Sequence, residues 1–197
     1  MSEKSTRNRS FFVGIFILIA YSMLVSLFTQ QPVIVMLADV ISGLAVIGIA
    51  VFLFPIFKKA RRNAAVIYFL LKAIEGALMI GAGVLYLNVS YRHIRTLIYD
   101  KVHIYPFMFG ALCLYYLILK TKIVPRFIVI WGFIAIAALY VNTILGVFGV
   151  HHALLDAFMI LIISNEIFFA FWLMFKGFSE SELKKTGYLL RTLGDGH

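Results

Sequence analysis

Residues 33–57 read VIVMLADVISGLAVIGIAVFLFPIF, an apolar stretch interrupted by a single acid, Asp39. A membrane-spanning α-helix needs about 20 predominantly apolar residues in succession, so this stretch is long enough to cross a bilayer. It lacks the strict alternation of apolar and polar residues that is typical of strands in a membrane β-barrel. The stretch therefore predicts a transmembrane helix.

Five further apolar stretches of comparable length flank this one, bounded by charged residues, prolines or polar residues; they cover residues 11–28, 64–89, 102–119, 127–149 and 153–178. The predicted fold is an all-α integral membrane protein with six transmembrane helices. Residues 1–10 are then a short N-terminal segment, 11–178 a six-helix transmembrane bundle and 179–197 a tail. The connections are short except for residues 90–101, which we expect to form the longest loop.

The composition agrees with a membrane protein and excludes several other classes. Of the 197 residues, 62% are hydrophobic and only 14% are charged, whereas soluble domains average about 25% charged residues. The apolar content excludes a disordered chain, and the single cysteine, Cys113, excludes a disulfide scaffold. Too few polar residues remain to cover a soluble nucleic-acid-binding protein, so no nucleic-acid partner is expected.

The distribution of Lys and Arg predicts the orientation, because short loops rich in these residues stay in the cytoplasm. Fourteen of the 18 basic residues lie in the N-terminal segment, in the second and fourth connections and in the tail, while Arg92, Arg95 and Lys101 lie on the opposite side. Both termini are therefore predicted to be cytoplasmic, in the inner membrane of a bacterium. The basic connections would contact anionic lipid headgroups.

Several polar residues fall inside the predicted spans, where a charge costs about 2.5–3.5 kcal/mol and usually faces the bundle interior. These residues are Asp39, Lys72, Glu75, Asn142, Asn165 and Glu166. Helical rise places Lys72, Glu75 and Glu166 near the midplane and Asp39 and Asn142 roughly 10 Å below the outer surface. We expect them to form one buried polar network that binds a ligand.

Lys72 and Glu75 are three residues apart, so they share a helix face and can form an ion pair. One reading is structural, with Lys72 bridging Glu75 and Glu166 between helices. The functional reading is a binding or proton-relay site, because one ammonium cannot balance two carboxylates. A proton, a cation or a cationic ligand group would supply the missing charge.

Histidines on the outer side give a second candidate site. His103, His151, His152 and Asp156 all map to the predicted outer side of the membrane. Imidazole and carboxylate groups are ligands that suit Zn²⁺. No HExxH-type spacing and no cysteine partner accompany them, so the predicted site set contains no metal and no cofactor. A metal site at these residues remains the alternative.

Four segments resemble a bacterial multi-pass membrane family catalogued as domain of unknown function 4386. They are the stretch from Leu37 to Lys58, FLLKAIEGALM at 69–79, LKTKIVPRFIVIWGF at 119–133 and NEIFFAFWLMFKGF at 165–178. The resemblance, over residues 11–178, implies that the family's pattern positions are Asp39, Lys72, Glu75, Pro125, Arg126, Glu166, Trp172, Leu173, Lys176 and Gly177. Lys72 stands where the family more often has Arg. Lysine lacks the planar guanidinium that can donate two parallel hydrogen bonds to a carboxylate.

The resemblance implies a fold and a topology but no activity, and three functions stay open. The first is a non-enzymatic protein, alone or as a homo-oligomer, that binds or transports a proton, a cation or a small amphiphile. The second is a membrane-embedded, metal-dependent enzyme acting on lipid. The third is an accessory or immunity-like protein whose buried charges are structural. Small residues, Ala73, Ala77 and Gly81 on the third stretch and Gly43 to Gly48 on the second, predict closely packed helices.

Overall fold

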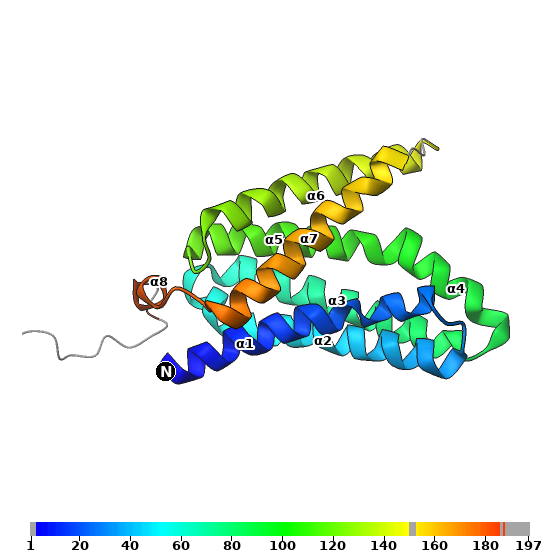
Figure 1. Cartoon of the computed structure of the whole chain (residues 1–197), viewed down its shortest axis with the longest axis horizontal. Coiled ribbons are helices and arrows are strands. Elements are labelled where there is room, and N and C mark those ends of the chain that lie inside the picture. The colour runs from blue at the N-terminus through cyan, green and yellow to red at the C-terminus, as the bar shows by residue number, and fades with distance from the viewer. Residues whose placement is uncertain (1–2, 150–152, 186, 188–197) are drawn as a thin grey trace, which may run out of the picture.

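The computed structural model is helical throughout its described part, which comprises residues 3–149, 153–185 and 187, without the side chains of 3–4 and 153–159. Long helices run roughly side by side along the longest axis, and α6 and α7 diverge from the others at one end (Figure 1). The elements in chain order are α1 (Glu3–Ala20), the 3₁₀-helix η1 (Tyr21–Leu27), α2 (Pro32–Ala60), α3 (Arg62–Tyr86), the 3₁₀-helix η2 (Val89–Tyr91), α4 (Arg92–Leu97), the π-helix η3 (Ile98–His103), α5 (Ile104–Thr121), α6 (Arg126–Val147), α7 (Ala153–Phe175) and α8 (Glu180–Lys185).

Five helical segments among the described residues are long and apolar enough to cross a membrane: Ser5–Leu27, Pro32–Ala60, Arg62–Tyr86, Val89–Thr121 and Arg126–Val147. The sixth predicted span corresponds to α7, of which Ile160–Phe175 is a shorter apolar helix within the described side chains. This composition indicates a membrane protein. Residues 3–10, predicted as a segment preceding the first span, are already part of α1.

The segment 90–101 differs from the predicted loop. It forms η2, α4 and most of η3, which lead directly into α5, so that helix runs from Val89 to Thr121 with only local changes of winding. Its charged residues suggested a loop because the sequence does not show which partners they meet. Pro106 near the start of α5 lacks the N–H that would bond to the preceding turn, and the wider π-helical turn lies immediately before it.

The tightest helix crossing joins α2 and α3. A Cβ added at Gly43 would lie 2.5 Å from the Gly76 carbonyl oxygen, and one added at Gly76 would lie 2.5 Å from the Gly43 carbonyl oxygen. Small residues thus allow the two backbones to touch. Gly81, which the sequence pattern placed at such a contact, has no atom within 4 Å of its Cβ position; the contact lies at Gly76, one turn nearer the start of α3.

The remaining helices pack around this pair. Helix α1 packs on α2 and α7, α3 packs on α5, and α6 packs on both α5 and α7. Where the first turns of α1 meet the end of α7, Arg7 donates hydrogen bonds from Nη2 to the carbonyl oxygens of Met174 and Phe175, 3.0 and 2.7 Å away. These are carbonyls of the last turn of α7, where a cation is favourable.

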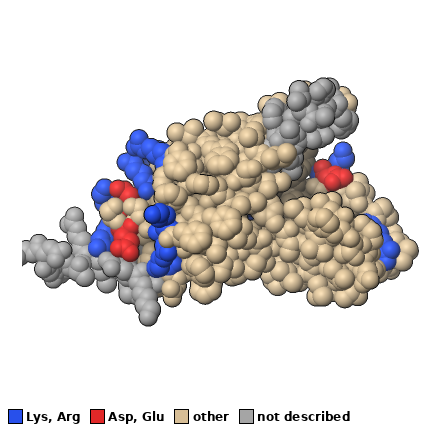
Figure 2. All heavy atoms as spheres, in the orientation of Figure 1, with Lys and Arg blue, Asp and Glu red and all other residues tan. Residues whose placement is uncertain are grey.

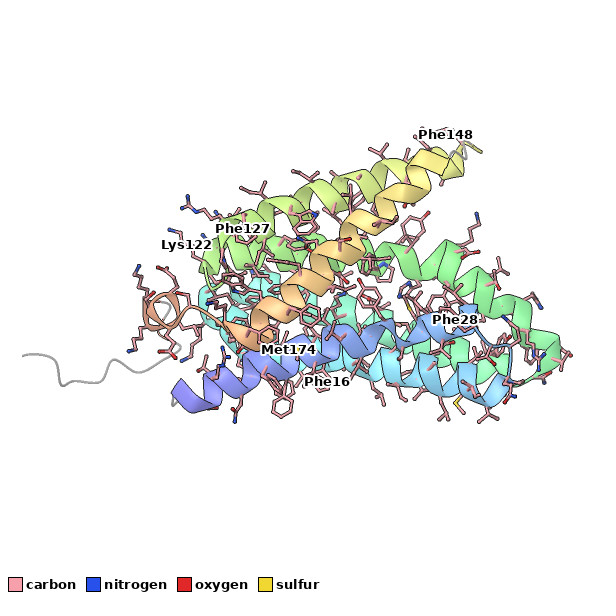
Figure 3. The ribbon with its side chains drawn as sticks, in the orientation of Figure 1. Phe16, Phe28, Lys122, Phe127, Phe148 and Met174 are labelled. Carbon is pink, nitrogen blue, oxygen red and sulfur yellow. The ribbon has the colours of Figure 1, made fainter. Side chains whose placement is uncertain are left out.

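Charge and exposed apolar groups are arranged as a bilayer requires. Lys and Arg gather at the end that carries the N-terminus and α8, and the long flank between the two ends is almost free of charge (Figure 2). Phe28 and Phe148 are 88% and 77% exposed, and Figure 3 shows Phe148 at the end of α6 opposite Lys122. Exposed aromatic rings of this size need an apolar surrounding.

Candidate functional site

A cavity of about 220 Å³ lies inside the bundle, between α1, α2, α3, α5 and α7. Its wall is mostly apolar, and a few polar side chains converge on it from different helices. The polar and aromatic residues of the wall are Tyr21, Tyr68, Lys72, Glu75, Tyr99, His103, Phe107, Glu166 and Phe169. An apolar pocket with a few convergent polar groups is the usual form of a small-molecule site.

Lys72 and Glu75 enter the cavity from α3. Both are buried, and Lys72 Nζ lies 2.8 Å from Glu75 Oε2, the ion pair expected from their three-residue spacing. The Lys72 ammonium also lies 5.2 Å from the centre of the Phe107 ring, a cation–π distance. Gly110 of α5 faces this lysine, since a Cβ there would be 3.4 Å from Lys72 Cε.

Glu166 enters the same cavity from α7. The Tyr21 hydroxyl donates a 2.7 Å hydrogen bond to Glu166 Oε2, which joins α7 to the point where α1 changes into η1. Within the described residues no Lys, Arg or His lies within ion-pair distance of Glu166. The predicted lysine bridge between Glu75 and Glu166 is therefore made only to Glu75.

Three buried polar atoms at the cavity form no hydrogen bond with a described residue: the Tyr68 hydroxyl, His103 Nε2 and Glu75 Oε2, the last of which is held in the ion pair with Lys72. Tyr68 is 0% exposed and His103 is 7% exposed. His103 Nε2 lies 3.9 Å from Glu75 Oε1, and its ring lies between those of Tyr99 and Phe107, at centroid distances of 5.1 and 6.3 Å. Buried polar groups are nearly always paired, so unpaired ones at a cavity have bonding capacity left for water or for a bound ligand.

Asp39 belongs to a separate cluster beside the cavity. Its carboxylate accepts two hydrogen bonds from Arg95, from Nε at 2.7 Å and Nη2 at 2.9 Å, and a third from the Tyr99 hydroxyl at 2.9 Å. The Arg95 guanidinium also lies 4.7 Å from the centre of the Tyr99 ring. Tyr99 lines the cavity and Asp39 does not, so Asp39 is connected to the cavity wall through its hydrogen bond with Tyr99.

The two asparagines of the predicted network lie elsewhere. Asn165 is buried, donates from Nδ2 to the Ile128 carbonyl oxygen at 3.0 Å and accepts a hydrogen bond from the Tyr115 hydroxyl, which joins α7 to α6 and α5. Asn142 is half-buried on α6 and does not line the cavity. Of the six predicted residues the structure thus brings together Lys72, Glu75 and Glu166.

Sequence reasoning missed the tyrosines of the site and assigned His103 to the outer surface. A usable signal was present, because Arg95, Tyr99 and His103 repeat every four residues and would share one face of a helix. The segment was predicted to be a loop, so this spacing was not interpreted. Tyr68, Lys72 and Glu75 have the same kind of spacing on α3.

The alternative metal site has no support among the described side chains, which contain no group of three or more His, Cys, Asp or Glu placed to hold a metal ion. His151, His152 and the side chain of Asp156 lie outside the described residues. His103 faces Glu75 inside the bundle.

Chemically, the cavity combines one ammonium and two carboxylates with hydroxyl, imidazole and aromatic groups. It can accept hydrogen bonds and balance a positive charge.

Comparison with known proteins gives a match to one family model over part of the chain, and no activity. No curated protein matches the chain, and no solved structure does. A family model described as "Domain of unknown function (DUF4386)" matches residues 89–177. The match includes Glu166 and the positions from Pro125 to Gly177 on which the resemblance rests, and it begins after Asp39, Lys72 and Glu75. The resemblance is thereby confirmed: residues 89–177 of this chain match the DUF4386 family.

Proposed function

We propose that this chain is a six-span membrane protein that binds a small ligand in the cavity between α1, α2, α3, α5 and α7. The observation that carries the proposal is Glu166, whose carboxylate lines the cavity, accepts a hydrogen bond from Tyr21 and has no cationic side chain in contact among the described residues. A charge inside a membrane-spanning bundle is costly, so its presence favours a functional role. Binding is the step that a transporter, a sensor or a receptor of small molecules would share.

The proposed topology places both termini in the cytoplasm, in the inner membrane of a bacterium. It is supported by the gathering of Lys and Arg at the end that carries the N-terminus and α8 (Figure 2). With α7 as the sixth span, an even number of crossings returns the chain to the side on which it began. Anionic lipid headgroups are the proposed partners of this basic end. If the protein transports its ligand, a homo-oligomer would supply the symmetry that a single chain lacks.

The proposal can be tested by filling the cavity. Ala20 lines the cavity, whereas Ala77 of α3 is exposed on the outside of the bundle. In lipid nanodiscs, fluorine NMR would measure the binding of 4-fluorobenzylamine and 4-fluorobenzyl alcohol, which are similar in size and differ in charge. We expect Ala20→Phe to abolish the binding of whichever probe binds the natural chain, and Ala77→Phe to leave it intact.

If neither probe binds the natural chain, or if Ala77→Phe weakens binding as much as Ala20→Phe does, the cavity is not a binding site for molecules of this kind.

A further inference from the structure

We infer that the ligand of this cavity is an organic ammonium ion, a primary or secondary amine with a small apolar body, whose ammonium group lies against Glu166. The inference rests on the proposed function and adds the chemical class of the ligand.

The first support is the balance of charge. Lys72 is the one Lys or Arg among the described residues that line the cavity, and its ammonium is in contact with Glu75. Glu166 is left with the hydroxyl of Tyr21. A single positive charge on the ligand would balance the second carboxylate, and a neutral or anionic ligand would not.

The second support is the balance of hydrogen bonds. An ammonium group carries donors and no acceptor. Two groups with spare capacity at the cavity, the carboxylate of Glu166 and the hydroxyl of Tyr68, can accept a hydrogen bond. Tyr68 lines the same cavity as Glu75 and Glu166.

The third support is the aromatic lining. Aromatic faces attract cations, and this structure already uses that contact twice at the cavity wall, with Lys72 over Phe107 at 5.2 Å and Arg95 over Tyr99 at 4.7 Å. The rings of Tyr21, Tyr68 and Phe169 also line the cavity and are not covered by a Lys or Arg in the described residues. They are placed to contact a bound cation.

The size and polarity of the cavity favour an organic ion over a bare metal ion. Its volume of about 220 Å³ equals roughly seven water molecules at about 30 Å³ each, far more than one ion fills. Hard cations such as Ca²⁺ need about six to eight oxygen ligands, whereas most of the wall is apolar. A short alkyl chain or a single ring fits this wall, and a lipid with two acyl chains does not.

The experiment compares the two probes directly. 4-Fluorobenzylamine is protonated at neutral pH and 4-fluorobenzyl alcohol is not, so their ratio of affinities in the natural chain measures the effect of charge without any mutation. We expect the amine to bind about tenfold more tightly. In Glu166→Gln the preference should fall to about threefold or less, while Glu182→Gln, which alters an acid of α8 outside the cavity, should retain it.

Equal binding of the two probes would overturn the ammonium assignment and leave the proposed binding function intact. A preference that survives Glu166→Gln would also overturn it, because the charge would then act elsewhere. Binding of neither probe would count against both proposals. If Glu166→Gln does not fold, Tyr68→Phe provides a second test, because it removes one hydrogen-bond acceptor and no charge. This substitution should weaken the binding of 4-fluorobenzylamine and leave the binding of 4-fluorobenzyl alcohol unchanged.

Discussion

Asp39 shows how a single residue can be tolerated in the apolar interior of a membrane protein. Three hydrogen bonds from Arg95 and Tyr99 occupy its two carboxylate oxygens. Arg95 reaches it from α4, which belongs to the helical segment Val89–Thr121. Pairing offsets much of the cost of burying this carboxylate, whereas removing one partner would leave the other charge buried without compensation.

Asp39→Asn should therefore destabilise the protein strongly, because Arg95 would lose its counter-ion. Breaking a buried pair costs about 3–5 kcal/mol, and the lower end of this range applies since the Arg95 side chain is 14% exposed. Thermal unfolding in detergent or nanodiscs would measure the effect, with Asp100→Asn, an exposed acid, as the control. Equal unfolding temperatures for the two variants would show that the pair contributes little.

Glu182 and Lys185 form a second ion pair, on α8 outside the membrane spans. The Lys185 ammonium donates a 2.6 Å hydrogen bond to Glu182 Oε1, and this bond lowers the pKa of the Glu182 carboxyl. A lowered pKa means that the contact stabilises the folded chain above the ordinary carboxyl pKa and that this stabilisation is lost as the pH falls through the folded-state value.

Lys185→Gln should consequently raise the Glu182 pKa toward its ordinary value. A pH titration followed by NMR of ¹³C-labelled glutamate would measure it, with Lys101→Gln at the opposite end of the molecule as the control. An unchanged Glu182 pKa in Lys185→Gln would mean that the hydrogen bond does not persist in solution.

At the scale of elements, the α2–α3 pair is fixed by two glycines. Gly76→Ala would place a methyl group 2.5 Å from the Gly43 carbonyl oxygen and 2.6 Å from Ile47 Cγ1, so the helices must separate. Overpacking of this kind costs about 1–3 kcal/mol. Gly81→Ala, on the same helix but with open space around it, should be neutral or slightly stabilising.

Thermal unfolding of the two alanine variants in the same detergent measures this difference. A Gly76→Ala protein as stable as Gly81→Ala would show that the two backbones do not approach as closely as described.

At the scale of the whole molecule, the distribution of charge predicts how the bundle sits in the membrane. Single cysteines in a Cys113→Ser background can report the side of four exposed positions: Gln31 and Asn88 on the predicted outer side, Arg61 and Lys122 on the predicted inner side. A membrane-impermeant maleimide should label Gln31→Cys and Asn88→Cys on intact cells, and Arg61→Cys and Lys122→Cys only after permeabilisation.

The reverse pattern would invert the orientation. If intact cells label one position from the predicted outer side and one from the predicted inner side, the chain does not cross the membrane between every pair of successive positions. That result would contradict six spans.

The helical class and the approximate spans were predictable from sequence because each depends on local composition. Backbone groups in a bilayer must bond within their own helix, so a long apolar stretch such as 33–57 leaves few alternatives. The segment 90–101 was not predictable in the same way. Arg95 has its partner, Asp39, on another helix, so the sequence alone makes Arg95 look like a loop residue.

The candidate site was predictable in part for the same reason. Lys72 and Glu75 are neighbours along one helix, so their ion pair follows from spacing. Glu166 lies far from them in the chain, and its pairing with Tyr21 depends on how α1 packs against α7.

That the protein is a bundle of apolar helices with costly charges inside it follows from its sequence, because length, hydropathy and spacing act within single helices. How those charges are divided depends on the packing of the helices. The tertiary structure assigned Asp39 to Arg95, Asn165 to a helix contact, and Lys72, Glu75 and Glu166 to one cavity, because the partner of a buried charge is set by which helix faces meet.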